Sequence, residues 1–311
     1  MKIVFFGTSE FAIPSLEVLH RSGHELLAVV TQADKPAGRG RKVLESPVKQ
    51  WASGRKIQVL QPENSSDFSF MMTLKQMNPE LFVLVSYGKI LPPFLLALPP
   101  RGAINVHPSL LPRYRGANPV SWAILNGETK TGISIIQMAE EVDAGEILLQ
   151  QSVDIGINED AIQLSERLSK LGGELLPEVL HQIQEGKAKP LPQKGKPTFA
   201  PRFRKEEGWI DWRRSAEDLS RRIRAFVPWP GNFSALHGKR VVVWKGRVVE
   251  GETKGKPGEV LELRPQGIVV ATGKGRLLLE EIQLEGKERM ESGSFLLGHP
   301  LRVGETFSCN P

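Results

Sequence analysis

The chain has 311 residues, of which 40% are hydrophobic and 24% charged, and its net charge at pH 7 is +6. This length predicts two domains with substantial cores. Apolar stretches such as residues 1–6 and 81–85 are far shorter than the roughly 18 residues that a membrane span needs, so we expect no membrane partner. A first β-strand explains the N-terminus better than a signal peptide, because no small-residue cleavage site follows it. The single cysteine, Cys309, excludes an intramolecular disulfide and fits a cytoplasmic protein.

The N-terminal part alternates apolar runs with amphipathic stretches. Strands are predicted at residues 2–6, 25–31 and 57–60, and helices at 13–20 and 47–53. Residues 81–85 are apolar at every position, which is typical of a strand buried on both faces. This βαβαβ order predicts an α/β fold with a Rossmann-like, mostly parallel sheet and helices on both faces.

The same domain continues to residue 187. We predict strands at 103–106, 132–138 and 146–153, with the last two paired as a hairpin, and helices at 119–125 and 160–185. The first domain is therefore expected to span residues 1–187.

Residues 188–206 are rich in Pro, Lys and Arg without periodicity, and we interpret them as a basic interdomain linker. The pattern then changes class. Ser215 opens a helical segment, and the strands predicted after it are short and divided by Gly and Pro: 240–244, 258–263, 267–271, 276–282 and 301–306. Residues 207–311 are therefore predicted to form a smaller, OB-like β-barrel domain.

Asn105 and His107 stand two positions apart on one predicted strand, so both side chains project from the same face. The strand ends in a Pro-punctuated loop, and the carboxyl ends of such strands are where open α/β sheets place ligands. With Asp143 in the run Val-Asp-Ala-Gly-Glu, the residues form a candidate acyl-transfer site. The alternative is that Asn105 caps a turn and His107 is a satisfied structural histidine.

Other cofactor motifs are incomplete. Gly7 is the only glycine of a dinucleotide fingerprint that follows the first strand, which argues against NAD or FAD. Neither a Walker loop nor a paired Cys/His zinc pattern is present, so we expect no metal. Positive charge instead gathers in the Gly-rich segment around Lys35 and in the linker, which favours a polyanionic partner, although a solvated loop explains each cluster equally well.

Residues 105–117 (NVHPSLLPRYRGA), followed by Asp143-Ala144-Gly145, resemble the formyltransferase family that uses 10-formyltetrahydrofolate. The opening FFGTSEFA at residues 5–12, the basic KPAGRGRK at 35–42, and the motifs IDW at 210–212 and RAF at 224–226 narrow the resemblance. Over essentially the whole chain, it is to members that formylate methionyl initiator tRNA, so the resemblance implies translation initiation as the process, with 10-formyltetrahydrofolate as formyl donor and co-substrate.

The resemblance also implies site residues. Formyl transfer to an amine passes through a tetrahedral oxyanion, for which Asn105 and His107 would be donors, with Asp143 as base or as the orienter of His107. The residues implied to contact folate are Tyr87, Gly88, Ile90, Leu91, Ser109, Leu110, Leu111 and Pro112.

For tRNA, the resemblance implies a loop at residues 33–43 that enters the acceptor end. The basic residues implied to contact tRNA are Lys35, Arg39, Arg41, Lys42, Lys194, Lys196, Arg202 and Arg204. The helix with Arg221, Arg222 and Arg224 would continue this positive track to the barrel.

Three alternatives stay open at this point. The same chemistry could act on a small amine, either glycinamide ribonucleotide or an amino sugar. A hydrolase could release formate without an amine acceptor. A non-catalytic RNA-binding module would use the basic surfaces alone. We expect a monomer, because the sequence contains no coiled-coil pattern or exposed apolar seam.

Overall fold

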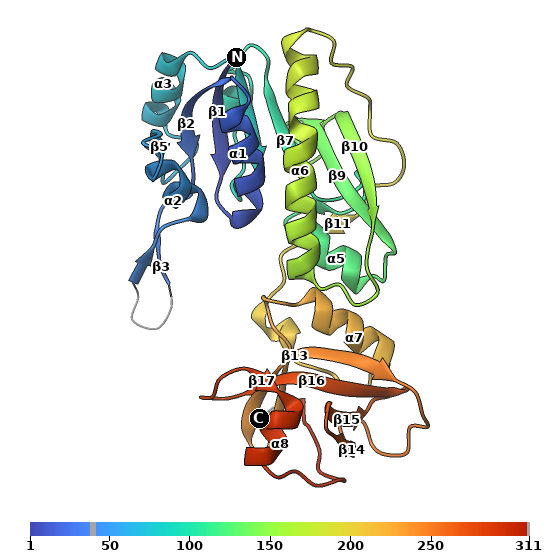
Figure 1. Ribbon diagram of the computed structural model, residues 1–311. Helices are drawn as coiled ribbons and strands as arrows, with labels where there is room; N and C mark the ends of the chain where they lie inside the picture. Colours follow the sequence, from blue (N-terminus) through green and yellow to red (C-terminus); the bar gives the residue numbers. More distant parts are fainter. Residues whose placement is uncertain (38–41, 310–311) are drawn as a thin grey trace. The chain divides into compact units, whose positions relative to one another are not determined.

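The computed structural model describes residues 1–37 and 42–309, which divide into two compact units (Figure 1). Unit 1 comprises Met1–Pro119, Lys130–Asp154 and Ser165–Ala200. Unit 2 comprises Val120–Thr129, Ile155–Leu164 and Pro201–Pro311. The boundaries 1–187, 188–206 and 207–311 stay a prediction. No helix of the described chain is long and apolar enough to cross a membrane.

Unit 1 contains a seven-stranded sheet in the order β10-β9-β7-β6-β1-β2-β5. The five neighbouring strands β7, β6, β1, β2 and β5 run parallel. Strand β9 is antiparallel to β7, and β10 is antiparallel to β9. This confirms the Rossmann-like, mostly parallel sheet and the hairpin. The strands are β1 (Lys2–Gly7), β2 (Glu25–Val30), β5 (Val59–Leu60), β6 (Leu81–Val85), β7 (Ala103–His107), β9 (Lys130–Gln137) and β10 (Ile147–Asp154).

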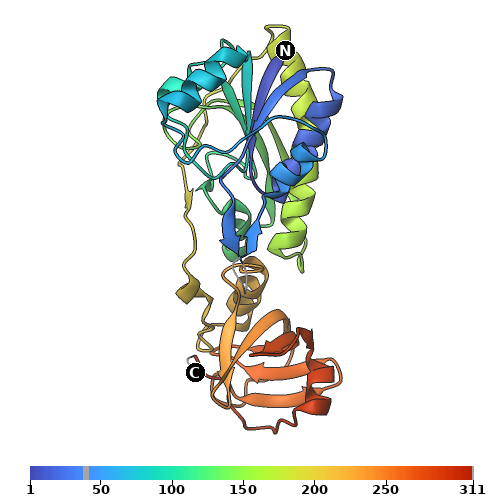
Figure 2. The same cartoon turned by 90° about the vertical axis from the view of Figure 1, so that its left-hand side faces the viewer.

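Helices cover both faces of this sheet, as Figure 2 shows. Phe70 and Leu74 of α3 join Phe6 and Phe82 in a buried cluster on one face. On the other face α6 packs closely, since a Cβ on Gly172 would lie 2.8 Å from Val106 Cγ1. The helices as far as residue 184 are η1 (Glu10–Ala12), α1 (Ile13–Arg21), α2 (Pro47–Ser53), α3 (Phe68–Met77), α4 (Pro93–Leu96), α5 (Pro119–Leu125) and α6 (Ala161–Gln184).

Helices α3 and α4 were not predicted from the sequence. Helix α4 has only four residues, too few to show a period, and the apolar residues of α3 do not keep one clean helical stripe.

Residues 189–200, which we call the strap, follow α6 and belong to unit 1. Leu191 forms an isolated bridge with Ile147, and β11 (Phe199–Ala200) pairs in parallel with β8 (Arg115–Gly116). Leu191, Thr198 and Ala200, which lie in the segment interpreted as a linker, therefore make backbone hydrogen bonds to other parts of unit 1.

Unit 2 contains an antiparallel sheet in the order β12-β13-β16-β15-β14, with β17 paired to β16. Ser215 begins α7, because its hydroxyl accepts a hydrogen bond from the Asp218 amide at 3.1 Å, as the sequence predicted. The elements are η2 (Lys205–Gly208), α7 (Ala216–Ala225), β12 (Phe233–Leu236), β13 (Lys239–Val249), β14 (Val260–Arg264), β15 (Gly267–Ala271), β16 (Arg276–Leu284), β17 (Met290–Glu291) and α8 (Ser292–Gly298).

The C-terminal segment links the two edges of this sheet. Phe307 N donates to Gly258 O at 2.8 Å beside β14, and Ala235 of β12 exchanges two backbone hydrogen bonds with Ser308. The prediction of a strand at 301–306 is wrong. The chain turns at Gly304, where φ is +92°, and the residues after it make only single bridges to other segments. The second domain of short antiparallel strands is confirmed.

Candidate active site

Asp143 is the centre of a hydrogen-bonded group on unit 1. Its carboxylate accepts a hydrogen bond from Asn105 Nδ2 at 3.3 Å on Oδ1 and one from the Gly116 amide at 2.8 Å on Oδ2. His107 Nδ1 lies 3.5 Å from Oδ2. The structure therefore brings together the three residues that the sequence singled out, and it adds the Gly116 amide.

The strand geometry explains this meeting. Ala103 belongs to the buried cluster on the α3 face of the sheet, and residues two and four positions further along β7 project from the same face. Asn105 and His107 are these residues. Asp143 reaches them from the turn between β9 and β10, where its backbone is left-handed with φ of +53°.

The group is shielded from water. The His107 side chain is 5% exposed and that of Asp143 is 12% exposed, whereas Asn105 is half-buried. Charges act more strongly on one another where water is excluded. Among residues 1–37 and 42–309, no cluster of three or more His, Cys, Asp or Glu is placed to hold a metal ion.

One hydrogen bond of His107 places a hydrogen on Nε2. Nε2 lies 3.0 Å from the backbone carbonyl oxygen of Tyr114, which can only accept, so Nε2 carries a hydrogen. Nδ1 faces the Asp143 carboxylate. Since both ring nitrogens face protein oxygens, the imidazole in this conformation acts on the site through Asp143.

The loop after β7 is braced by Ser134 and Gln150. Ser134 Oγ donates to Ser109 O at 2.6 Å and accepts from the Leu111 amide at 3.1 Å. Gln150 Nε2 donates to Leu111 O at 3.1 Å and to Ser134 Oγ at 2.7 Å. These contacts leave the loop little freedom, so it holds Tyr114 and Gly116 in place beside Asp143.

The predicted folate-contacting residues of this loop differ in exposure. Ser109, Leu111 and Pro112 are buried, and Leu110 is half-buried. Their contribution to binding stays a prediction.

The second predicted folate segment follows β6. Tyr87 is 3% exposed, and burial raises the pKa of its phenol. Its carbonyl accepts hydrogen bonds from Thr8 Oγ1 at 2.9 Å and Gln32 Nε2 at 2.8 Å. Leu91 is also buried, whereas Ile90 is 72% exposed. Of this segment, Ile90 presents an apolar side chain to solvent, and Gly88 adopts φ of +77°.

The basic segment begins and ends in a two-stranded sheet. Lys35 lies on β3 (Lys35–Ala37) and Lys42 on β4 (Lys42–Leu44), which pair antiparallel. Arg39 and Arg41 lie outside the described residues. The segment predicted as a loop thus has paired flanks.

Lys49 joins the two ends of this segment. Its ammonium makes an ion pair with Asp34, just before β3, and another with Glu45, just after β4, at 3.0 Å. Gln61 Nε2 donates to Asp34 Oδ1 at 2.8 Å. The hydrogen bonds from Lys49 and then Gln61 hold the pKa of the Asp34 carboxyl below its ordinary value.

Asp34 should therefore give a pH-dependent contribution to stability. Because its pKa is lower in the folded state, the ionised carboxylate stabilises the fold above its unfolded pKa, and this is lost as pH falls through the folded pKa. We expect the difference in unfolding free energy between wild type and Asp34→Asn to shrink below about pH 4, measured by urea denaturation. The exposed Asp154→Asn serves as control, and a pH-independent difference would contradict the assignment.

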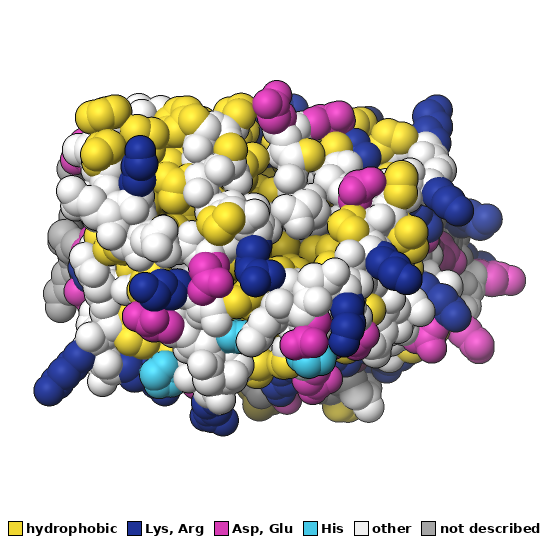
Figure 3. Space-filling model, turned by 90° about the horizontal axis from the view of Figure 1, so that it is seen from above, with side chains coloured by type: hydrophobic (Ala, Val, Ile, Leu, Met, Phe, Trp, Pro, Cys, Tyr) yellow, Lys and Arg dark blue, Asp and Glu magenta, His cyan; other side chains and the backbone are white. Residues whose placement is uncertain are grey.

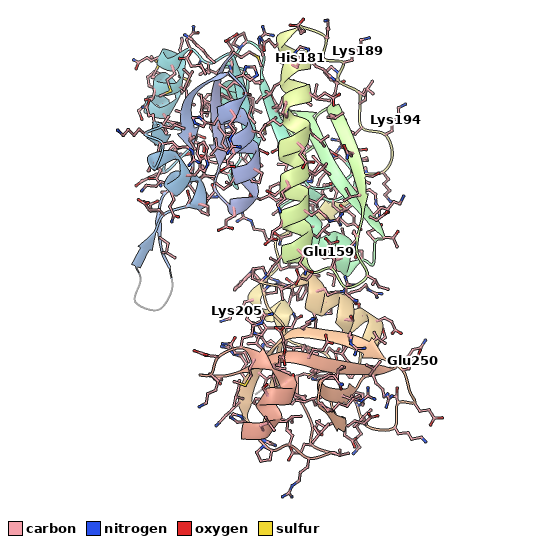
Figure 4. All side chains as sticks on the ribbon, in the orientation of Figure 1. Glu159, His181, Lys189, Lys194, Lys205 and Glu250 are labelled. Carbon is pink, nitrogen blue, oxygen red and sulfur yellow. The ribbon has the colours of Figure 1, made fainter. Side chains whose placement is uncertain are left out.

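The remaining predicted tRNA contacts, Lys194, Lys196, Arg202 and Arg204, are all exposed. Figure 4 shows Lys194 pointing away from the sheet. Arg204 Nε lies 3.9 Å from Glu207. On the face drawn in Figure 3, carboxylates lie among the Lys and Arg side chains, so charge does not single out a binding surface there.

Two arginines of α7 have structural partners. Arg222 donates to Glu207 O at 2.6 Å and lies over the Phe226 ring, and Arg224 donates to Glu159 O at 2.9 Å. Burial lowers the pKa of both guanidinium groups. The structure therefore uses these arginines within unit 2 instead of presenting them as an exposed positive track.

A further residue, Gln193 of the strap, contacts the turn that carries Asp143. Gln193 was not predicted, because a glutamine in an aperiodic Pro- and Lys-rich segment gives no signal of its own. Only the folded chain brings it to the site.

The class of the protein follows from the family models that match both parts of the chain. A formyl transferase model matches residues 1–180, and a model of the formyl transferase C-terminal domain matches residues 202–300. The chain belongs to the formyl transferase family.

Similar curated proteins belong to one kind of formyltransferase. The chain is 44% identical to methionyl-tRNA formyltransferase of Pelotomaculum thermopropionicum over 305 residues, which cover 98% of this chain and 97% of that protein. It is 45% identical to methionyl-tRNA formyltransferase of Caldanaerobacter subterraneus over 306 residues, covering 98% and 99%.

Solved structures share the fold. Methionyl-tRNA formyltransferase from Clostridium thermocellum matches with a TM-score of 0.56 at 17% identity, over 81% of this chain and 95% of that one. WlaRD, a sugar 3N-formyl transferase, matches with a TM-score of 0.68 at 18% identity, over 93% and 99%. HypX from Aquifex aeolicus, solved with tetrahydrofolic acid, matches with a TM-score of 0.66 at 21% identity, and this chain spans about half its length, 47%.

Proposed function

We propose that this chain transfers the formyl group of 10-formyltetrahydrofolate to the α-amino group of methionine on initiator tRNA, for translation initiation. The observation that carries the proposal is the Asp143 carboxylate held between Asn105, His107 and the Gly116 amide. Curated relatives that are named for this reaction and cover 98% of the chain support it.

The neutral amine attacks the formyl carbon, and a tetrahedral intermediate with an oxyanion forms. Asn105 Nδ2 has two hydrogens and uses one on Asp143, so the second can donate to the oxyanion. Asp143 takes the proton from the attacking nitrogen. The bond from the formyl carbon to folate N10 then breaks, N10 receives a proton, and the new amide is released.

His107 supports Asp143 in this scheme. The imidazole donates to Tyr114 O through Nε2 and places Nδ1 beside the carboxylate. A proton shared between Asp143 and Nδ1 would let the carboxyl group accept and return a proton without leaving an isolated buried charge.

The other assignments belong to the same proposal. Residues 1–187 would be the catalytic domain, 188–206 the basic linker and 207–311 the tRNA-binding domain of a cytoplasmic monomer. The residues proposed to bind folate are Tyr87, Gly88, Ile90, Leu91, Ser109, Leu110, Leu111 and Pro112. Those proposed to bind tRNA are Lys35, Arg39, Arg41, Lys42, Lys194, Lys196, Arg202 and Arg204.

The test is incorporation of label from 10-formyltetrahydrofolate into methionyl-tRNA, with initiator and elongator tRNA compared at one stated salt concentration. Labelling of the initiator alone supports both chemistry and partner. Labelling of glycinamide ribonucleotide or an amino sugar instead would keep the site chemistry and overturn the tRNA assignment. Release of formate without an acceptor would indicate a hydrolase.

Arg39→Ala tests the role proposed for the basic segment. Loss of one arginine contact to nucleic acid costs roughly 1–3 kcal/mol, so we expect kcat/KM for initiator tRNA to fall about tenfold or more. The KM for the folate should stay unchanged. Arg21→Ala removes an exposed arginine of α1 and is the control. Equal effects of Arg39→Ala on folate and tRNA would overturn the assignment.

A further inference from the structure

We propose that Gln193 is a positioning residue that holds Asp143 in its reactive place. The inference rests on the proposed function, because it deepens the role of that same site. Gln193 lies on the strap, outside the strand and turn that supply Asn105, His107 and Asp143.

The amide nitrogen of Gln193 holds the turn that carries Asp143. Nε2 donates to the Asp143 carbonyl oxygen at 2.7 Å and to the Gly145 carbonyl oxygen at 2.8 Å. These two carbonyls flank Ala144. Both hydrogens of one amide are thus used to fix the backbone of a residue whose φ is +53°, a conformation that non-glycine residues seldom adopt.

The amide oxygen of Gln193 holds the opposite loop. Oε1 accepts hydrogen bonds from Arg115 Nε at 3.2 Å and Arg115 Nη2 at 2.7 Å. Arg115 Nη1 in turn lies 3.0 Å from Glu141 Oε1. A flipped amide would point its hydrogens at the guanidinium and its oxygen at two carbonyls, so only this orientation is compatible with the partners.

The two loops that Gln193 joins both touch the reactive group. Arg115 stands between Tyr114, whose carbonyl accepts from His107 Nε2, and Gly116, whose amide donates to Asp143 Oδ2. A shift of the Asp143 turn relative to this loop would therefore break the carboxylate's contact with Gly116 and change its distance from His107.

The strap is itself fixed on either side of Gln193. Leu191 exchanges backbone hydrogen bonds with Ile147 at 2.8 and 2.9 Å. Thr198 accepts from the Tyr114 amide at 2.9 Å through Oγ1 and from the Arg115 amide at 2.9 Å through its carbonyl. Tyr114 also has a left-handed backbone, with φ of +61°. The strap thus contacts both left-handed residues of the site, and strained residues persist where several contacts restrain them.

Gln193→Leu tests the proposal, because it keeps the approximate size of the side chain and removes all four hydrogen bonds. We expect kcat at saturating substrates to fall by about 30-fold or more, since small displacements of a reacting group cost up to about 100-fold. The KM values for folate and for methionyl-tRNA should change less than about threefold, because in this proposal Gln193 acts on the Asp143 turn and not on a substrate. Gln151→Leu, an exposed glutamine on β10, is the matched control.

Gln193→Glu separates the two halves of the interaction. A carboxylate can still accept from Arg115, but it cannot donate to the carbonyls of Asp143 and Gly145. We expect its kcat to fall at least as far as that of Gln193→Leu. Wild-type kcat in either variant, or a rise in the KM for tRNA with kcat unchanged, would overturn the proposal.

A readout without substrate distinguishes this proposal from the proposed function. The ¹⁵N signals of the His107 ring, assigned with His107→Gln, report the neighbourhood of its two nitrogens. They should shift in Gln193→Leu and stay unchanged in Gln151→Leu, even if the wild type formylates some other amine. Unchanged His107 signals in Gln193→Leu would overturn the positioning role whatever the substrate is.

Discussion

Asp143→Asn is expected to reduce kcat by roughly 10³-fold to 10⁴-fold, the size of effect known when an aspartate that orients a catalytic histidine becomes asparagine. Both oxygens of Asp143 accept hydrogen bonds, from Asn105 Nδ2 and from the Gly116 amide. An asparagine has one acceptor, so its amide nitrogen would face a donor. It also cannot take the proton of the attacking amine.

Single-turnover formyl transfer and tRNA binding, measured on the same preparation, check this prediction. Asp154→Asn changes an exposed aspartate of the same unit and should retain full activity. The variant Asp143→Asn should bind methionyl-tRNA as the wild type does. Full turnover in Asp143→Asn would contradict a catalytic role for Asp143. Binding of methionyl-tRNA without formyl transfer in the wild type would support the RNA-binding alternative.

Gly145→Ala should reduce kcat by about 100-fold. Gly145 has no reactive group, and the effect is expected because the substitution displaces Asp143. A Cβ at Gly145 would lie 1.7 Å from the carbonyl oxygen of Gln137 and 3.4 Å from the Ala139 amide nitrogen. These neighbours are backbone atoms of β9 and of the chain just after it, which cannot give way as a flexible side chain can. The turn that carries Gly145 must therefore move. Asp143, two residues earlier, would move with it and lose its contact with Gly116.

The comparison of Gly145→Ala with Gly54→Ala makes this test specific. Gly54 follows α2 with a helical φ of −62°, and a Cβ there would meet only Gln50 O at 3.5 Å and Trp51 O at 3.8 Å, both ordinary contacts. Gly54→Ala should therefore keep the wild-type kcat and melting temperature. Wild-type kcat in Gly145→Ala would show that Asp143 does not need its observed position.

The strongest patterns in the sequence predicted the fold of unit 1 well. Strand β6 is apolar at all five positions and lies buried between β1 and β7, and the long stripe of α6 gave nearly its full extent. The closing segment of unit 2 was predicted poorly. Residues 305–308 make single bridges to two edges of the sheet, and such contacts between distant segments leave no periodic pattern.

The candidate site, too, could be predicted only in part. The spacing of Asn105 and His107 was enough to place both side chains on one face, because a strand has a period of two. Asp143 could be named as a candidate from its residue type, but its place beside them could not be predicted, since its turn reaches β7 only through the pairing of β9 with that strand. The Gly116 amide and Gln193 could not be predicted. Gly116 acts through its backbone amide and Gln193 through hydrogen bonds to backbone carbonyls, and neither role depends on a recognisable residue type.

The strap also determines where this protein can be divided by an engineer. The two family models end at residue 180 and begin again at 202, so fragments cut at these limits would lack residues 181–201. That stretch supplies β11, the Thr198 contacts and Gln193. A fragment that keeps the candidate site intact, for fusion to a different domain, must therefore extend through Ala200, the last residue of unit 1.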